Sequence, residues 1–170
     1  MSRIISLKVI GDIDWSKEVD LDFGSICVLV YYCSTINRPM SLKLMNALLT
    51  ESTYRYENDI PSEAYTSDNP ISHYGPENMQ ELIYFLTNQI IPNLSTQEID
   101  LISQVYGGIE NFINLYYDGP PFLGYFGIGN SELFEGFSGY TPNLVICATS
   151  LCAFFQRVKE RNMKYEIYIE

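Results

Sequence analysis

The chain has 170 residues, of which 46% are apolar, and its 21 acidic side chains outnumber its 10 basic ones. A chain of this length is typical of one domain, and it buries enough surface to fold without disulfides or metal ions. The formal net charge of −11 argues against nucleic acid and anionic membranes as partners, because both attract positive surfaces.

An antiparallel meander of three strands is predicted for the first third of the chain. Residues 5–9 and 18–23 each alternate between apolar and polar side chains, which is the pattern of a half-buried strand. A Gly-Ser pair then suits a tight turn, and the apolar run 26–33 fits a central strand covered on both faces. The second strand places three carboxylates in a row on one solvent face, those of Glu18, Asp20 and Asp22.

Three helices are predicted to follow the meander, each from apolar residues at helical spacing. The first begins at Pro39. The second begins at Pro76 and ends before Pro92, because proline is well suited to the first turn of a helix and cannot continue one. The third begins with a capping box at residues 95–98 and ends at a Gly-Gly pair.

The last third of the chain is predicted to hold two more helices and a strand. The helices cover about residues 109–116 and 141–161, and residues 165–169 alternate as a closing strand. Together the elements predict a single α+β domain over residues 1–170. Its sheet is mainly antiparallel, made of the N-terminal meander plus the C-terminal strand, and it packs with about five helices.

Two stretches have no clear helical or strand period. Residues 120–140 are rich in Gly and Phe and fit a hairpin. Residues 51–75 form an irregular stretch of the length that is functional or disordered in compact domains. Because disordered segments are poor in aromatic residues, its tyrosines favour a loop that is ordered, either alone or by a partner.

Charge is strongly segregated along the chain. Residues 1–55 hold six bases and six acids, and residues 157–170 have a net charge of +1. Residues 56–156 hold twelve acids and no Lys or Arg, so only the two ends of the chain supply salt-bridge partners to the middle. Unpaired like charges destabilise a compact state and provide solubility or steering of a charged partner.

No residue pattern predicts a reaction or a cofactor. His73 is the only histidine, so no base is available beside a Ser or Cys nucleophile unless His73 supplies it. The chain has no Walker sequence and no complete dinucleotide fingerprint. Residues 12–18 begin like a calcium loop, but Lys17 takes the place of the required glycine. We therefore expect a protein without enzymatic activity, cofactor or metal.

The chain start and the cysteines predict a cytoplasmic protein. The first ten residues lack the apolar core and cleavage site of a signal peptide, and the most apolar windows, 26–33 and 144–155, are too short to span a membrane. The four cysteines form no C-x-x-C pair and lie in apolar runs, where a free cysteine behaves as a small hydrophobe.

Features suited to protein binding are abundant by contrast. Fourteen tyrosines offer large contact area with few rotatable bonds, and surrounding acids give speed and selectivity toward a basic partner. The first candidate binding surface lies in residues 51–75 and comprises Tyr54, Tyr56, Glu57, Asp59, Glu63, Tyr65 and Asp68. The second surrounds the Gly/Phe-rich segment and comprises Asp118, Glu132 and Glu135.

A small, acidic, cytoplasmic α+β protein without an active-site pattern resembles the immunity proteins of bacterial toxin systems, such as those of contact-dependent growth inhibition. The resemblance is one of protein type over the whole chain and carries over no individual residue. It implies tight binding and neutralisation of a cognate toxin domain, often a basic nuclease whose active site the acidic surface would cover.

Other classes of function stay open on the sequence alone. An acidic nucleic-acid mimic would carry carboxylates at phosphate-like spacing over a long surface. A secretion chaperone would dimerise through a helix. A carboxylate-dependent hydrolase would show a cleft with two acids within ~5–10 Å. Neither the identity of the partner nor the oligomeric state follows from the sequence.

Overall fold

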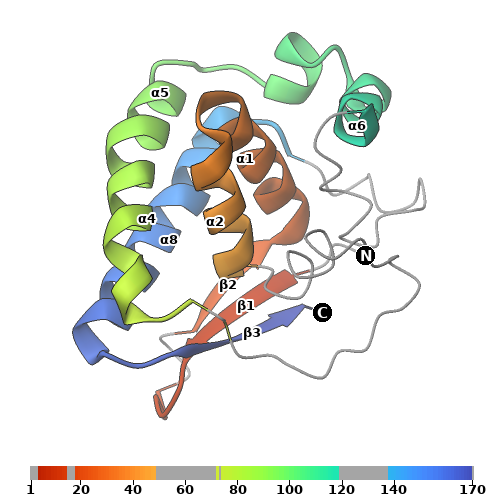
Figure 1. The fold of residues 1–170 in the computed structure, drawn as a ribbon. Coiled ribbons are helices and arrows are strands. Elements are labelled where there is room, and N and C mark those ends of the chain that lie inside the picture. Colours follow the sequence, from red (N-terminus) through yellow and green to blue (C-terminus); the bar gives the residue numbers. More distant parts are fainter. Residues whose placement is uncertain (1–3, 15–17, 49–71, 73, 119–137, 170) are drawn as a thin grey trace.

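The structure, a computed structural model, describes residues 4–14, 18–48, 72, 74–118 and 138–169. Helices lie on one side of a three-stranded antiparallel sheet (Figure 1), which confirms the predicted α+β class. The elements in chain order are β1 (Ile4–Val9), β2 (Val19–Asp22), α1 (Phe23–Ile36), α2 (Arg38–Leu48), the 3₁₀ turn η3 (Pro76–Asn78), α4 (Met79–Phe85), the π-helical turn η4 (Leu86–Ile90), α5 (Ile91–Ser95), a second π-helical turn η5 (Leu101–Val105), α6 (Ile109–Asp118), α8 (Thr141–Arg161) and β3 (Tyr165–Ile169).

The sheet joins the two ends of the chain, with strand order β2–β1–β3. β1 is central, and its Leu7 lies opposite Val19 of β2 on one side and Ile167 of β3 on the other. Successive side chains of a strand point to opposite faces, and those of Ile5 and Leu7 are completely buried on the helical side. The predicted closing strand is therefore confirmed, and it pairs with the first strand of the chain.

The apolar run 26–33 forms the middle of α1, so the predicted third strand of the meander is wrong. All of these residues except Tyr31 are buried. Burial on every side removes the period that distinguishes a helix from a strand. The N-cap directs this segment into a helix, because Asp22 Oδ2 accepts hydrogen bonds from the backbone N–H and the hydroxyl of Ser25 at 2.7 and 2.8 Å. No Gly-Ser turn forms between β2 and α1.

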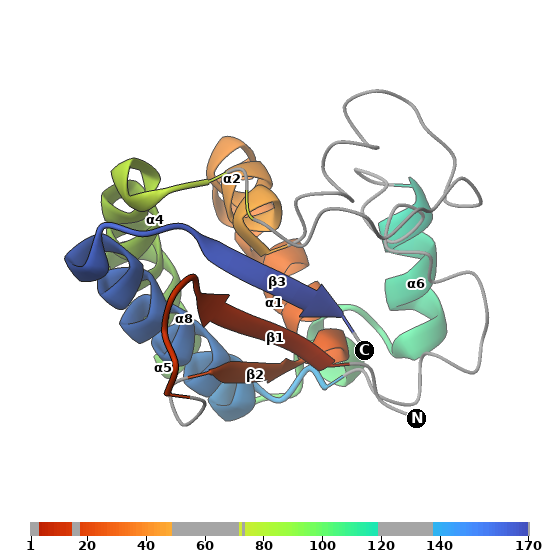
Figure 2. The ribbon, with the colours of Figure 1, turned by 90° about the horizontal axis from the view of Figure 1, so that it is seen from below.

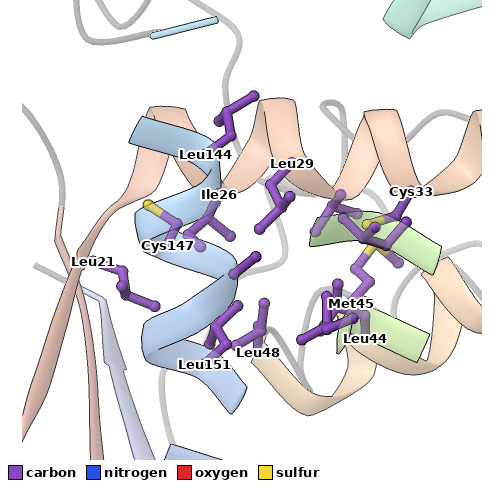
Figure 3. Close-up of a cluster of buried hydrophobic side chains, with 14 of the residues drawn as sticks. Leu21, Ile26, Leu29, Cys33, Leu44, Met45, Leu48, Leu144, Cys147 and Leu151 are labelled. Carbon is purple, nitrogen blue, oxygen red and sulfur yellow. The ribbon is translucent and has the colours of Figure 1, made fainter. Parts of the chain in front are cut away.

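The core lies where α1, α2 and α8 meet against the helical side of the sheet. Figure 3 shows side chains from the three helices and from β2 pointing toward one another. Ile26 and Leu29 of α1, Leu48 of α2 and Leu151 of α8 have an exposed fraction of 0%. The apolar stripes that predicted helices from Pro39 and from Thr141 are thereby confirmed as faces that turn to the core.

The helical segment from Pro76 continues past Pro92, contrary to the predicted end. Proline lacks the N–H for an α-helical bond, and its ring clashes with the carbonyl four residues earlier. The turn before it is a π turn, in which the Ile91 N–H donates to the carbonyl of Leu86, and α5 then carries Pro92 as far as Ser95. The wider turn lets α4, η4 and α5 follow one another as a single segment.

The predicted capping box at residues 95–98 does not start a helix. The Ser95 hydroxyl donates to the carbonyl of Ile91 at 2.7 Å, so this serine ends α5. The next turn, η5, is capped by Asp100, whose Oδ1 accepts from the N–H groups of Ile102 and Ser103 at 2.9 and 3.2 Å. α6 begins at Ile109 after the Gly-Gly pair, as predicted.

Candidate partner-binding surface

Most of the predicted site residues lie outside the part of the chain that the structure describes. Of the first surface, Tyr54, Tyr56, Glu57, Asp59, Glu63, Tyr65 and Asp68 all lie outside the described residues, and of the second, so do Glu132 and Glu135. Asp118 is the last residue of α6, where only the backbone is described. Whether either group forms one surface therefore stays a prediction, and the described residues offer two other surfaces.

The first of these surfaces is the face of the sheet that points away from the helices, here called the open sheet face. Figure 2 looks onto this face, with β2, β1 and β3 in front of the helices. Alternation along the strands places the buried side chains behind it. Its members are Ile4, Ser6 and Lys8 of β1, Glu18 and Asp20 at β2, and Lys164, Glu166 and Tyr168 at β3, while the carboxylate of Asp22 turns to the N-terminus of α1.

Cross-strand pairing brings acids and a tyrosine together on the open sheet face. Ser6 lies opposite Asp20 on one side and Tyr168 on the other, and its hydroxyl donates to Asp20 Oδ1 at 2.6 Å. Lys8 lies opposite Glu166. Three carboxylates against two ammonium groups leave an excess of one negative charge on this face. Two of the three acids, Glu18 and Asp20, belong to the predicted carboxylate row of β2, whose third member, Asp22, caps α1 instead.

Tyr168 is held beside an acid on this face. Its hydroxyl donates to Glu166 Oε2 at 2.6 Å. That hydrogen bond, followed by partial desolvation and the charges of Glu166 and Glu18, raises the pKa of Tyr168. The charges of these two acids also favour a cation near the ring. With 39% of Tyr168 exposed, an incoming basic side chain has access to the ring.

The second surface is an open groove of about 650 Å³ between α2 and the segment η3–α4, here called the α2–α4 groove. Its lining includes Met40 of α2 and, from the segment, Glu77, Gln80, Glu81, Tyr84 and Phe85. Lys43 Nζ donates to Glu81 Oε2 at 2.7 Å across the two helices, and this bond raises the pKa of Lys43. Lys159 of α8 donates to Gln80 Oε1.

Metal-ligating side chains do not gather among the described residues, and three of the four cysteines are buried. No group of three His, Cys, Asp or Glu side chains among them is placed to bind a metal ion. Asp12, the first acid of the calcium-like stretch, forms an ion pair with Arg157. Cys27 and Cys33 are completely buried and Cys147 nearly so. Burial raises the pKa of Cys33. Burial, together with the charge of Asp22, raises the pKa of Cys147 to about 11. Within the same residues, no helix is both long and apolar enough to cross a membrane.

Comparisons with known proteins identify no relative for this chain. No protein-family model matches it, and no significant match is found among curated proteins or among solved structures. The argument for function therefore rests on the chain's own surfaces.

Two residues of the open sheet face, Glu166 and Tyr168, are absent from the predicted binding residues, and the fold brings them to that face. Tyr168 and Glu166 belong to the closing strand, and only its pairing with β1 places them beside the acids of β2. The alternation of residues 164–169 already indicated that Glu166 and Tyr168 share the solvent face. Tyr84 of the α2–α4 groove is also absent from the predicted binding residues, and it is 59% exposed.

Proposed function

We propose that this protein binds and neutralises a cognate toxin domain that presents a basic surface. The observation that carries the proposal is the open sheet face, where acids and an exposed tyrosine lie together on a rigid element. Acidic surfaces speed the encounter with a basic partner, and aromatic side chains supply contact area once it has docked. Occlusion of the toxin's active site then requires no chemistry from this chain.

The charge distribution is consistent with a basic partner as well as with a need for solubility. Residues 56–156 hold twelve acids and no base, so their carboxylates depend on the chain ends for ionic partners. Lys43 supplies one such partner to Glu81. The remaining negative charge favours association with a positive surface, at the cost of self-repulsion in the folded chain. The acids of residues 51–75 belong to the same proposal as a second contact region.

The decisive experiment tests binding and protection together. The chain is purified with the product of the gene immediately upstream, and the association rate constant is measured between ~50 and 500 mM salt. We expect a complex whose association slows steeply with salt, and cells that survive expression of the neighbour only when this chain is present. Absence of binding together with absence of protection would show that the proposal is wrong.

Charge reversal locates the binding surface. Glu18→Lys, Asp20→Lys and Glu166→Lys together are expected to slow association by about tenfold or more at low salt. The matched control reverses Glu98, Glu110 and Glu160, which are exposed on other elements and change the net charge equally. A third variant reverses Glu57, Asp59 and Glu63. If the control slows association as much as the sheet variant, the open sheet face is not the docking surface.

A further inference from the structure

We propose that the α2–α4 groove binds a segment of a partner protein in which an arginine or lysine is flanked by apolar residues. This site is separate from the open sheet face and does not depend on the proposed function. Its volume of about 650 Å³ falls within the range of ligand-binding pockets. Three features of the groove support this assignment, namely its apolar floor, the placement of its acids and the exposure of its tyrosine.

The floor and one wall of the groove are apolar. Phe85 closes the floor with 1% of its surface exposed, and Met40 lies half-buried on the α2 side. Tyr84 stands on the wall with 59% exposed, so most of its ring is available to an occupant. A flexible thioether beside aromatic rings adapts to apolar side chains of different shapes. These contacts suit the apolar residues of the segment.

The acids of the groove suit its basic residue. The lining holds two carboxylates and no base. Lys43 already pairs with Glu81, while among the described residues no base pairs with Glu77. The Glu77 carboxylate folds back over Gly75, within 3 Å of where a Cβ on that glycine would lie. The charge of Glu77 in the first helical turn also stabilises the helix. Helix stabilisation alone, however, does not explain why Tyr84 is exposed two turns further along.

The spacing of these groups matches a basic side chain. Glu77, Glu81 and Tyr84 follow one another at intervals of four and three residues, which places them along one stripe of the segment. Two helical turns span about 11 Å, so a long basic side chain can lie along the stripe. The methylene stem of such a side chain can pack on the Tyr84 ring while its charged head reaches toward Glu77 as an ionic partner. Because Lys43 occupies Glu81, it competes with the incoming cation.

A pair of short peptides provides the probe. The nitrogen-15-labelled full chain is titrated with acetyl-Leu-Arg-Leu-amide and, separately, with the same peptide carrying neutral citrulline instead of arginine. We expect chemical-shift changes at the amides of Glu77, Glu81 and Tyr84, with weaker binding of the citrulline peptide by at least about threefold. Equal binding of the two peptides, no binding of the arginine peptide at ~10 mM, or shift changes confined to other elements would overturn the proposal.

Three variants test the sign of the electrostatic effect. Glu77→Gln is expected to lower the affinity for the arginine peptide by at least about threefold. The matched control is Glu98→Gln, which is exposed on the α5–η5 connection. Lys43→Gln is expected to raise the affinity, because this change frees the Glu81 carboxylate. Lys164→Gln removes the same charge from a residue outside the groove lining and should leave the affinity unchanged. If Lys43→Gln weakens binding, or if it and Lys164→Gln have equal effects, the assigned chemistry is wrong. No toxin is used, so either result leaves the proposed function to its own test.

Discussion

Burial governs the chemistry of the core thiols at the scale of single residues. Cys27 and Cys33 have no exposed surface, and Cys147 has 9%. Burial disfavours a thiolate and keeps the proton on sulfur, and a protonated thiol is neither a good nucleophile nor a metal ligand. The interpretation of these three cysteines as small hydrophobes is therefore confirmed, while Cys152 is only half-buried.

The raised pKa of Cys147 predicts a loss of stability at alkaline pH. Its thiol has a pKa of about 11 in the folded protein and an ordinary value near 9 when unfolded, so the folded state binds the proton more tightly. The contribution of the protonated thiol to the free energy of unfolding is complete below about pH 9. It is lost as the pH rises toward 11, at up to about 1.4 kcal/mol per pH unit. Urea unfolding at pH 8, 9, 10 and 11 measures this slope.

The variant Cys147→Ala assigns that slope to one residue. The variant is expected to be less stable at pH 8, because it leaves a cavity in the core. Between pH 9 and 11, however, its stability should fall less steeply than that of the wild type. Identical slopes for the two proteins would show that Cys147 does not titrate with the shifted pKa.

Helix caps and prolines decide where elements begin and end. Asp22 ends β2 and caps α1 in one step, which makes this single carboxylate the boundary between strand and helix. Pro92 lies inside a helical segment because a π turn precedes it. At each boundary a local hydrogen-bond arrangement prevails over a sequence signal that predicted another structure. The competing signal was the Gly-Ser turn at Asp22 and the expected helix end at Pro92.

The cap of α1 yields a prediction at the scale of this element. Asp22→Ala removes the acceptor for the Ser25 N–H and a negative charge near the helix N-terminus, so it is expected to lower the free energy of unfolding by about 1–2 kcal/mol. Asp20→Ala is the matched control, since it removes the same charge two residues earlier and only an exposed hydrogen bond from Ser6. Urea denaturation compares the two. Equal losses would show that charge, rather than capping, stabilises the helix.

Polar links at the scale of the whole molecule connect the ends of the chain to each other and to its middle. Asp12, in the connection between β1 and β2, forms an ion pair with Arg157 of α8. Their side chains are only 10% and 20% exposed, so most of the water has been removed from this pair. Lys43 from the N-terminal third pairs with Glu81 in the base-free region, which confirms that the chain ends supply bases to the middle.

A double-mutant cycle tests the link between Asp12 and Arg157. Arg157→Met leaves a poorly solvated carboxylate and is expected to cost about 2–3 kcal/mol of stability. The double variant Asp12→Asn with Arg157→Met should recover part of that loss, giving a coupling energy above about 0.5 kcal/mol. Lys43→Gln breaks a more exposed pair and should cost less than about 1 kcal/mol. Additive losses at Asp12 and Arg157 would contradict the buried link.

The sequence by itself determined the elements that have one polar face. α2, α6, α8 and β3 lie where their apolar periods predicted them, because a half-buried element must alternate in step with its own geometry. The α+β class followed from these elements. Alternation also assigned Glu18 and Asp20 of the carboxylate row to the solvent face before their neighbours were known, whereas the third acid of the row, Asp22, caps α1.

Only the tertiary structure decided the elements and surfaces that lack such a period. The run 26–33 is buried on all sides, so no pattern separated strand from helix, and packing against α2 and α8 with the Asp22 cap made it α1. The open sheet face needs β3 beside β1, and the α2–α4 groove needs two helices from separate parts of the chain. Contacts between distant residues leave no mark on local spacing. The net charge of −11 follows from the sequence, but which acids lie beside Tyr168 is decided by the fold.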